Sequence, residues 1–167
     1  MYYAKSNPIE TIEEHTNRLL ENMKLLKKLY GIQILDKASF DKERFWDLLE
    51  IVCKYHDLGK VYTPFQNIIR KNLKEPLLNT EFNYEIIKHE QLSPMFIPVE
   101  KYNLSKDEKK LVYQAIYYHH ERDGKDINNI YVQEILEKDI IPQLEKIKSE
   151  IPYEIEENMN CMYIKYI

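Results

Sequence analysis

Apolar residues recur at helical spacing along most of this chain of 167 residues, and this pattern constrains the fold more than any other feature. In the first such segment, Ile12, Leu19 and Met23 keep a period near 3.6 residues, which is typical of an amphipathic helix. Alternation of apolar and polar residues, which would predict strands, is not sustained anywhere in the sequence. The sequence therefore predicts an all-α fold, a compact helical bundle.

Helix-starting and helix-stopping residues divide the chain into segments. Asn7-Pro8 predicts a helix start, with a capping side chain followed by proline in the first turn, and Gly31 predicts the end of that helix. Ser39 opens a second helix, and Thr63–Gln66 and Ser105–Glu108 both match a capping box. The predicted helices cover residues 9–30, 40–57, 63–73, 82–93, 105–121 and 130–150, the last of them broken near Pro142.

Length and composition bound the class of protein. The chain is long enough for one domain with its own core, and 44% hydrophobic residues with only three glycines argue against disorder. A net charge of -4 excludes a basic surface over the whole domain, so any contact with nucleic acid would be local. Cys53 and Cys161 form no disulfide pattern, and neither a signal peptide nor a membrane span is evident. We expect one cytoplasmic domain over residues 1–167, with no membrane partner.

Histidines of the first two helices lie on apolar faces. His15 follows Ile12 by three residues and precedes Leu19 by four, so it shares their side of the helix. His56 and Asp57 continue the apolar line that leads into the segment KYHDLGKVYTPFQ. Burial of an ionised carboxylate without a partner costs several kcal/mol or more, so Asp57 requires either a structural ion pair or a metal.

The remaining histidines repeat this placement. His89 lies on the apolar stripe of the predicted helix at residues 82–93. His119 and His120 follow the apolar pairs at 111–112 and 115–116 at a spacing of four residues. All five histidines of the chain are thus predicted to point inward, from four different helices.

The number of inward histidines favours a metal site over a structural one. A lone inward histidine is more often a core residue that is hydrogen-bonded to a carbonyl. Several neutral imidazoles would compete for few acceptors, protonated ones would repel one another, and a shared divalent metal removes both problems. Ligation rich in histidine favours Mn²⁺, Fe²⁺, Co²⁺ or Ni²⁺ over Mg²⁺. The sequence predicts a transition-metal site of one or two ions in the core.

The motif HDLGK at residues 56–60, with His15 about forty residues earlier, resembles the HD superfamily of metal-dependent phosphohydrolases. With PFQ at 64–66, KHEQLS at 88–93 and YYHH at 117–120, the order resembles the HD nuclease domain of CRISPR type I effector helicase-nucleases. The resemblance spans residues 15–120. It implies a metal-dependent nuclease that cuts single-stranded DNA in antiviral defence, together with a helicase domain or subunit and an RNA-guided surveillance complex.

The resemblance also implies roles for individual residues. Asp57 would bridge two metal ions and take part in catalysis, and Lys60 would lie beside the reacting phosphate. Ser93 would support His89. The ligands of the first ion would be His15, His56 and Asp57, and those of the second Asp57, His89, His119 and His120.

Two basic clusters could guide a phosphate backbone to the metals. The first follows the PFQ segment and the second follows the double histidine, although exposed basic residues often serve only solubility. Their residues are Arg70, Lys71 and Lys74 in the first cluster, and Arg122 and Lys125 in the second.

One departure from the family pattern keeps other functions open. Families of this kind usually supply a further aspartate from a late helix, and here Asp123 and Asp126 fall in a polar turn while Asp139 lies in the charged stretch LEKDI. The end of the sequence, NCMYIKYI, resembles the opening of a truncated apolar helix. The alternatives are an HD-superfamily nucleotide phosphohydrolase and a catalytically incomplete HD interaction domain.

Overall fold

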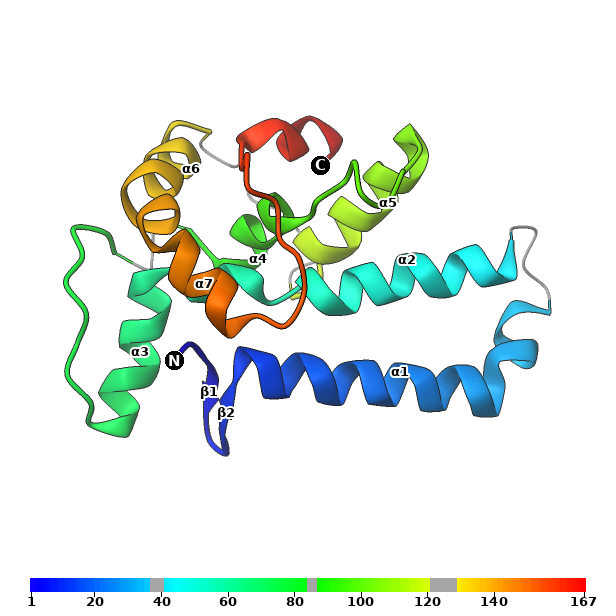
Figure 1. The fold of residues 1–167 in the computed structure, drawn as a ribbon, viewed down its shortest axis with the longest axis horizontal. Coiled ribbons are helices and arrows are strands. Elements are labelled where there is room, and N and C mark those ends of the chain that lie inside the picture. The colour runs from blue at the N-terminus through cyan, green and yellow to red at the C-terminus, as the bar shows by residue number, and fades with distance from the viewer. Residues whose placement is uncertain (37–40, 84–86, 121–128) are drawn as a thin grey trace.

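The computed structural model of the chain describes residues 1–36, 41–83, 87–120 and 129–167. Within these residues the protein is a bundle of helices with little sheet, which confirms the predicted all-α class (Figure 1). The one sheet described is an antiparallel hairpin of β1 (Tyr3–Ser6) and β2 (Ile9–Thr11).

This hairpin corrects the predicted helix start at Asn7-Pro8. The two residues form the turn between the strands, joined by a cis peptide bond. The backbone of Tyr3 is held at both its N–H and its carbonyl by the side-chain amide of Gln66, at 2.9 Å each. The helix begins only after Thr11, whose side chain forms the capping box. A contact between distant residues therefore outweighs the local signal for a helix start.

The first two helices lie side by side in an antiparallel pair (Figure 1). They are α1 (Ile12–Leu35) and α2 (Lys42–Tyr55). The predicted stop at Gly31 is wrong, because this glycine lies inside α1 and packs against Trp46. Asp41 caps α2, and the predicted cap at Ser39 lies outside the described residues.

Three α-helices lie in the described middle of the chain, and the first of them has the bounds that the sequence predicted, whereas the other two are shorter. These are α3 (Thr63–Leu73), α4 (His89–Leu92) and α5 (Lys106–Tyr117), with 3-10 turns at Leu58–Val61 and Ser93–Phe96. The predicted helix over 82–93 is reduced to α4, and the chain continues through Pro94 as a 3-10 turn; residues 84–86 lie outside the described part.

The two predicted capping boxes have different outcomes. The box of Ser105 and Glu108 forms at the start of α5. The box at Thr63 does not form, because the side chain of Gln66 is already bonded to Tyr3 and to the carbonyl of Lys60. A local motif is thus overridden where its polar side chain has a buried partner elsewhere.

The last part of the chain confirms a helical region with a break at Pro142. It contains α6 (Asn129–Ile135), a π-helical turn (Leu136–Ile140), a 3-10 turn (Ile141–Gln143) and α7 (Leu144–Glu150). The chain then returns across α4 and α5 and ends in a 3-10 helix, Cys161–Tyr166, where the sequence predicted the opening of an apolar helix (Figure 1).

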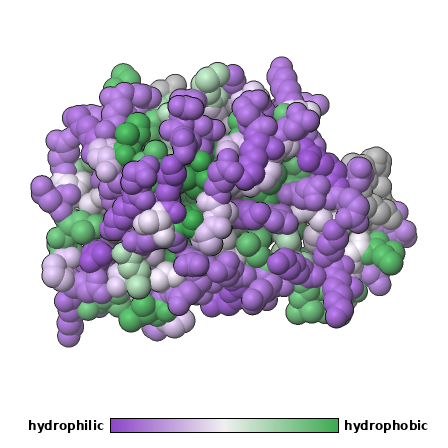
Figure 2. Space-filling model, viewed as in Figure 1, coloured by the Kyte–Doolittle hydropathy of each residue, from purple (hydrophilic) through white to green (hydrophobic). Residues whose placement is uncertain are grey.

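The hydrophobic core contains buried side chains of α2, α5 and α6. It also includes Leu58, Val61 and Tyr62, which follow the HD motif. Met23, Trp46 and Cys53 form a smaller cluster between α1 and α2. The face in Figure 2 is mainly hydrophilic, with scattered apolar side chains. No helix in the described part of the chain combines the length and the apolar character needed to cross a membrane.

Candidate metal centre

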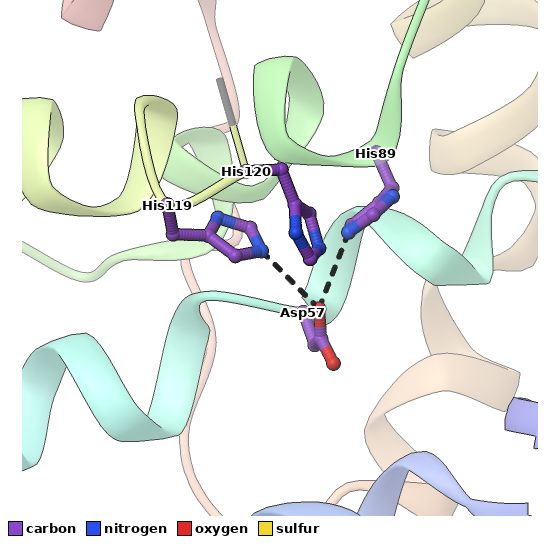
Figure 3. A group of neighbouring side chains, drawn as sticks. All are labelled: Asp57, His89, His119 and His120. Carbon is purple, nitrogen blue, oxygen red and sulfur yellow. Dashed lines mark ion pairs between the residues drawn. The ribbon is translucent and has the colours of Figure 1, made fainter. Parts of the chain in front are cut away.

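Residues from four separate segments meet around Asp57. His15 lies in the first turn of α1, and His56 caps the C-terminus of α2, directly before Asp57. His89 opens α4, while His119 and His120 follow α5 (Figure 3). The histidines predicted from the sequence are therefore brought together.

Gly59 allows the HD turn to approach α4 closely. Its N–H donates to the Ser93 hydroxyl at 2.9 Å, and this hydroxyl donates to the His89 carbonyl, also at 2.9 Å. A Cβ atom on Gly59 would lie only 2.0 Å from the His89 carbonyl oxygen, so no other residue fits without backbone movement. The predicted support of His89 by Ser93 thus acts on its backbone, and it fixes α4 against the HD turn.

Four imidazoles direct Nε2 toward the carboxylate of Asp57, two toward each oxygen. The distances to Oδ2 are 3.2 Å from His15 and 3.4 Å from His56. Those to Oδ1 are 3.3 Å from His89 and 3.6 Å from His119. Asp57 therefore lies between two pairs of histidines.

The other ring nitrogen of two histidines fixes the proton position. Nδ1 of His56 lies 3.1 Å from the Cys53 carbonyl oxygen, and Nδ1 of His119 lies 2.6 Å from that of Ile116. A carbonyl oxygen only accepts, so each Nδ1 carries the hydrogen. In the neutral ring Nε2 is then a bare lone pair that faces a carboxylate oxygen. Such a contact is unfavourable unless a cation lies between the two atoms.

Buried atoms without a hydrogen-bond partner mark the Oδ1 side of Asp57. Within the described structure, Oδ1 itself and Nε2 of His89 and of His119 have none. An unsatisfied buried polar group costs about 1–3 kcal/mol, and three in one place point to a missing shared partner. The residue groups that could hold a metal are Asp57 with His89, His119 and His120, and Asp57 with His15 and His56.

Electrostatics favour the protonation states that a metal requires at Asp57, His89 and His120, whereas the contact with Asp57 raises the pKa of His15. Burial alone would raise the pKa of Asp57, but the surrounding histidines outweigh it and hold this pKa well below its usual value. Burial lowers the pKa of His89 and of His120. An ionised carboxylate and neutral imidazoles are the forms that coordinate divalent cations.

Lys60 lies at the centre as well. Its ammonium donates to Asp57 Oδ2 at 2.7 Å and lies 5.6 Å from the centre of the Phe65 ring. The sequence placed this lysine beside the reacting phosphate; the structure places it beside the proposed metal ligands.

Glu10 is a residue of the site that the sequence analysis missed. It is 6% exposed on β2, and its carboxylate contacts Nδ1 of His15 at 3.0 Å, with Lys5 and Arg18 as further partners. This carboxylate fixes the orientation of the His15 ring, as acidic partners of metal-binding histidines do. Glu10 was missed because the predicted first helix, over residues 9–30, included the residues that form β2.

Asp139, which the sequence places in a charged stretch, is buried, but it lies away from the metal-binding groups. It is 7% exposed and accepts the backbone N–H of Thr63 at 2.8 Å, at the start of α3. Burial raises its pKa. Asp139 belongs to neither metal-binding group, and Asp123 and Asp126 lie outside the described residues.

The predicted apolar face before the double histidine is half right. Val112 and Ile116 are buried, whereas Leu111 and Ala115 are exposed. The α5 helix ends at Tyr117, so His119 and His120 reach the site from the turn that follows and not from the helix face.

The predicted nucleic-acid clusters are only partly described. Arg70 is paired with Glu75 at 2.9 Å, whereas Lys71 and Lys74 are exposed at the C-terminal end of α3. A helix rises about 1.5 Å per residue, so this end lies roughly 16 Å along α3 from the start near Lys60. The second cluster, Arg122 and Lys125, lies outside the described residues.

Comparison with known proteins gives one assignment. No curated protein and no solved structure gave a significant match to the chain. The HD domain family matches residues 12–151, a range that contains every residue of the two metal-binding groups. The chain therefore belongs to the HD domain family, within the superfamily of metal-dependent phosphohydrolases.

Proposed function

We propose that this chain is a metal-dependent nuclease that hydrolyses phosphodiester bonds of single-stranded DNA. The observation that carries the proposal is the convergence of four imidazole Nε2 atoms on the two oxygens of Asp57, with buried atoms left without partners on the Oδ1 side. A divalent ion held there would act as a Lewis acid on a phosphodiester and would activate water for its hydrolysis.

The protein residues prepare the site for this chemistry. Asp57 supplies the negative charge, and its low pKa keeps it ionised at neutral pH. His89, with a pKa lowered by burial, supplies a neutral nitrogen, and the carbonyl of Ile116 orients the ring of His119. These supports fix the ligand atoms before a metal or a substrate arrives.

Lys60 is suited to bind the substrate phosphate. An ammonium has three N–H donors, and the bond to Asp57 Oδ2 uses one of them. The other two remain available to a phosphate oxygen next to the metal, where they would stabilise the developing negative charge. The fixed backbone of the 3-10 turn holds this donor in place.

The interpretation as a nuclease and the CRISPR type I context rest on the motifs HDLGK, PFQ, KHEQLS and YYHH and on their order along the sequence. In that context the chain would act with a helicase domain or subunit and an RNA-guided surveillance complex. Exposed Lys71 and Lys74 are candidates for contacts with the DNA backbone. Nothing in the proposed chemistry reads bases, so cleavage would be independent of sequence.

Two alternatives remain to be separated by experiment. A nucleotide phosphohydrolase would use the same histidines and aspartate on a free nucleotide. A non-catalytic interaction domain is favoured by one observation: the described part of the chain brings no second carboxylate into either metal-binding group.

The test is incubation of Mn²⁺-loaded protein with circular single-stranded DNA and, separately, with a panel of nucleoside phosphates and cyclic dinucleotides. We expect loss of the circular DNA and no such loss in EDTA. Asp57→Asn should lower the rate roughly 100-fold or more. Asp139→Asn is the matched control, because Asp139 is also a buried aspartate but lies outside the metal-binding groups.

Cleavage in EDTA, or cleavage confined to one free nucleotide, would exclude the nuclease. Metal binding without turnover of any substrate would favour the interaction domain.

A further inference from the structure

The two oxygens of Asp57 have different surroundings. Oδ2 accepts a hydrogen bond from the Lys60 ammonium at 2.7 Å, in addition to its contacts with His15 and His56. Oδ1 faces His89 and His119 and has no hydrogen-bond partner in the described structure. One side of the carboxylate already has a cation, and the other side lacks one.

The ammonium on Oδ2 is held there by buried structure. The Lys60 side chain is 13% exposed and lies against the ring of Phe65. Its backbone N–H donates to the Asp57 carbonyl at 3.0 Å, and its own carbonyl accepts from the side chain of Gln66 at 2.6 Å. Gln66 is fully buried and is itself fixed by two bonds to Tyr3. The backbone of Lys60 is therefore fixed, and the side chain directs its ammonium at Asp57.

A divalent ion that shared Oδ2 with His15 and His56 would lie beside this ammonium. Two cations in contact with one oxygen repel each other, and the repulsion is strong where the protein excludes water. The unpartnered atoms follow the same division: all those around Asp57 lie on the Oδ1 side, at Oδ1, His89 and His119. On the Oδ1 side no cation of the described residues contacts the carboxylate, whereas on the Oδ2 side the Lys60 ammonium does.

We propose that the chain binds a single divalent ion, at the Oδ1 side of Asp57, and that the Lys60 ammonium takes the place of a second ion at the Oδ2 side. This inference rests on the proposed metal-dependent function and deepens it. His89, His119 and His120 are then metal ligands with Asp57. His15 and His56 lie against Oδ2 beside the ammonium, whose positive charge offsets the contact of the His56 lone pair with this oxygen, and they become ligands only when the ammonium is removed.

The test counts ions. Protein stripped with a chelator is dialysed against Mn²⁺, and bound metal is measured by mass spectrometry and by titration calorimetry. We expect one ion per wild-type chain and two per chain in Lys60→Met, where affinity for the second ion should rise roughly 100-fold. Lys60→Arg keeps a cation at the same place and should stay at one ion. Thermal unfolding of each variant checks that the fold is intact.

Histidine variants locate each ion. His89→Ala in the wild type should remove the single ion, whereas His15→Ala should leave it bound. In the Lys60→Met background, His15→Ala should reduce the count from two ions to one. These results would place the first ion at Oδ1 and the second at Oδ2.

Each other outcome is informative. Two ions in the wild type would overturn the role of Lys60 while leaving the metal-dependent function in place. One ion in a folded Lys60→Met variant would overturn it as well. A folded wild type that binds no ion would instead refute the proposed function.

Discussion

Replacement of Gly59 by alanine should separate the two halves of the metal centre. The added Cβ would lie 2.0 Å from the His89 carbonyl oxygen, 2.8 Å from the His89 carbonyl carbon and 2.9 Å from the Ser93 nitrogen. All three are backbone atoms, so no side-chain rotation relieves the contacts. Ordinary contact begins near 3.4 Å, so α4 and the HD turn must move apart by about 1.4 Å (3.4 − 2.0).

This movement has two measurable consequences. It breaks the bond between the Gly59 N–H and Ser93 and overpacks a buried contact, which together should lower the free energy of unfolding by about 2–4 kcal/mol. It also carries His89 away from Asp57, where Nε2 and Oδ1 are now 3.3 Å apart. We therefore expect Mn²⁺ affinity to fall roughly 10-fold or more. Urea denaturation and titration calorimetry measure the two effects.

Gly31→Ala is the matched control. Its Cβ would meet Trp46 at 3.6 Å, which is ordinary contact, and Gly31 lies inside a helix. The same chemical change should therefore stabilise the protein by about 0.5–1 kcal/mol and leave Mn²⁺ affinity unchanged. If Gly59→Ala unfolds like the wild type and binds Mn²⁺ equally well, the argument that Gly59 sets the approach of α4 is wrong.

Three further substitutions test other contacts. Ser93→Ala leaves the buried Gly59 N–H without its partner and should lower the free energy of unfolding by about 1–3 kcal/mol in urea; an unchanged value would mean that another acceptor replaces the hydroxyl. Arg44 lowers the pKa of Glu108 from 4.5 to about 2, so the wild type should lose up to about 1 kcal/mol of stability as the pH falls through this range. Arg44→Met should be less stable than the wild type at pH 6 and should lose less stability as the pH falls. Curves of thermal midpoint against pH that run parallel for the two proteins would contradict this. Burial raises the pKa of Asp139 above its ordinary 3.8, so the native state binds a proton at this carboxylate more tightly than the unfolded state does. Stability therefore falls as the pH rises from 3.8 through the native pKa. Asp139→Asn should make the thermal midpoint fall less steeply with rising pH, and an equal slope in both proteins would refute this prediction.

Features set by local chemistry were predictable from the sequence. The capping box at Ser105, the break at Pro142 and the inward side of His15 all depend on residues within a few positions of one another. The grouping of the histidines followed because several imidazoles that face a core have few partners other than a shared cation. These inferences needed no knowledge of how the helices pack.

Features set by distant partners were not predictable in the same way. Asn7-Pro8 carries the same local signal as a helix start, and only the bonds between Tyr3 and Gln66 decide for a hairpin. Asp139 is a charged side chain that is buried because its partner, the N–H of Thr63, comes from a distant segment. The contact of the Lys60 ammonium with Asp57 spans only three residues, yet the sequence analysis placed this lysine beside the reacting phosphate and did not predict its bond to the carboxylate.

The N-terminal hairpin is anchored by residues that are synthesised much later than the hairpin itself. The Tyr2 N–H donates to Glu150 at 2.7 Å, and the Tyr2 hydroxyl donates to Gln143 at 2.9 Å. A ribosome adds about 5–20 residues per second, so roughly 7–30 s separate Tyr2 from its partner at position 150. During that interval Glu10, which orients His15, lies on a hairpin that lacks these anchors. The hairpin that carries the acidic partner of His15 is therefore fully anchored only long after His15 itself has been synthesised.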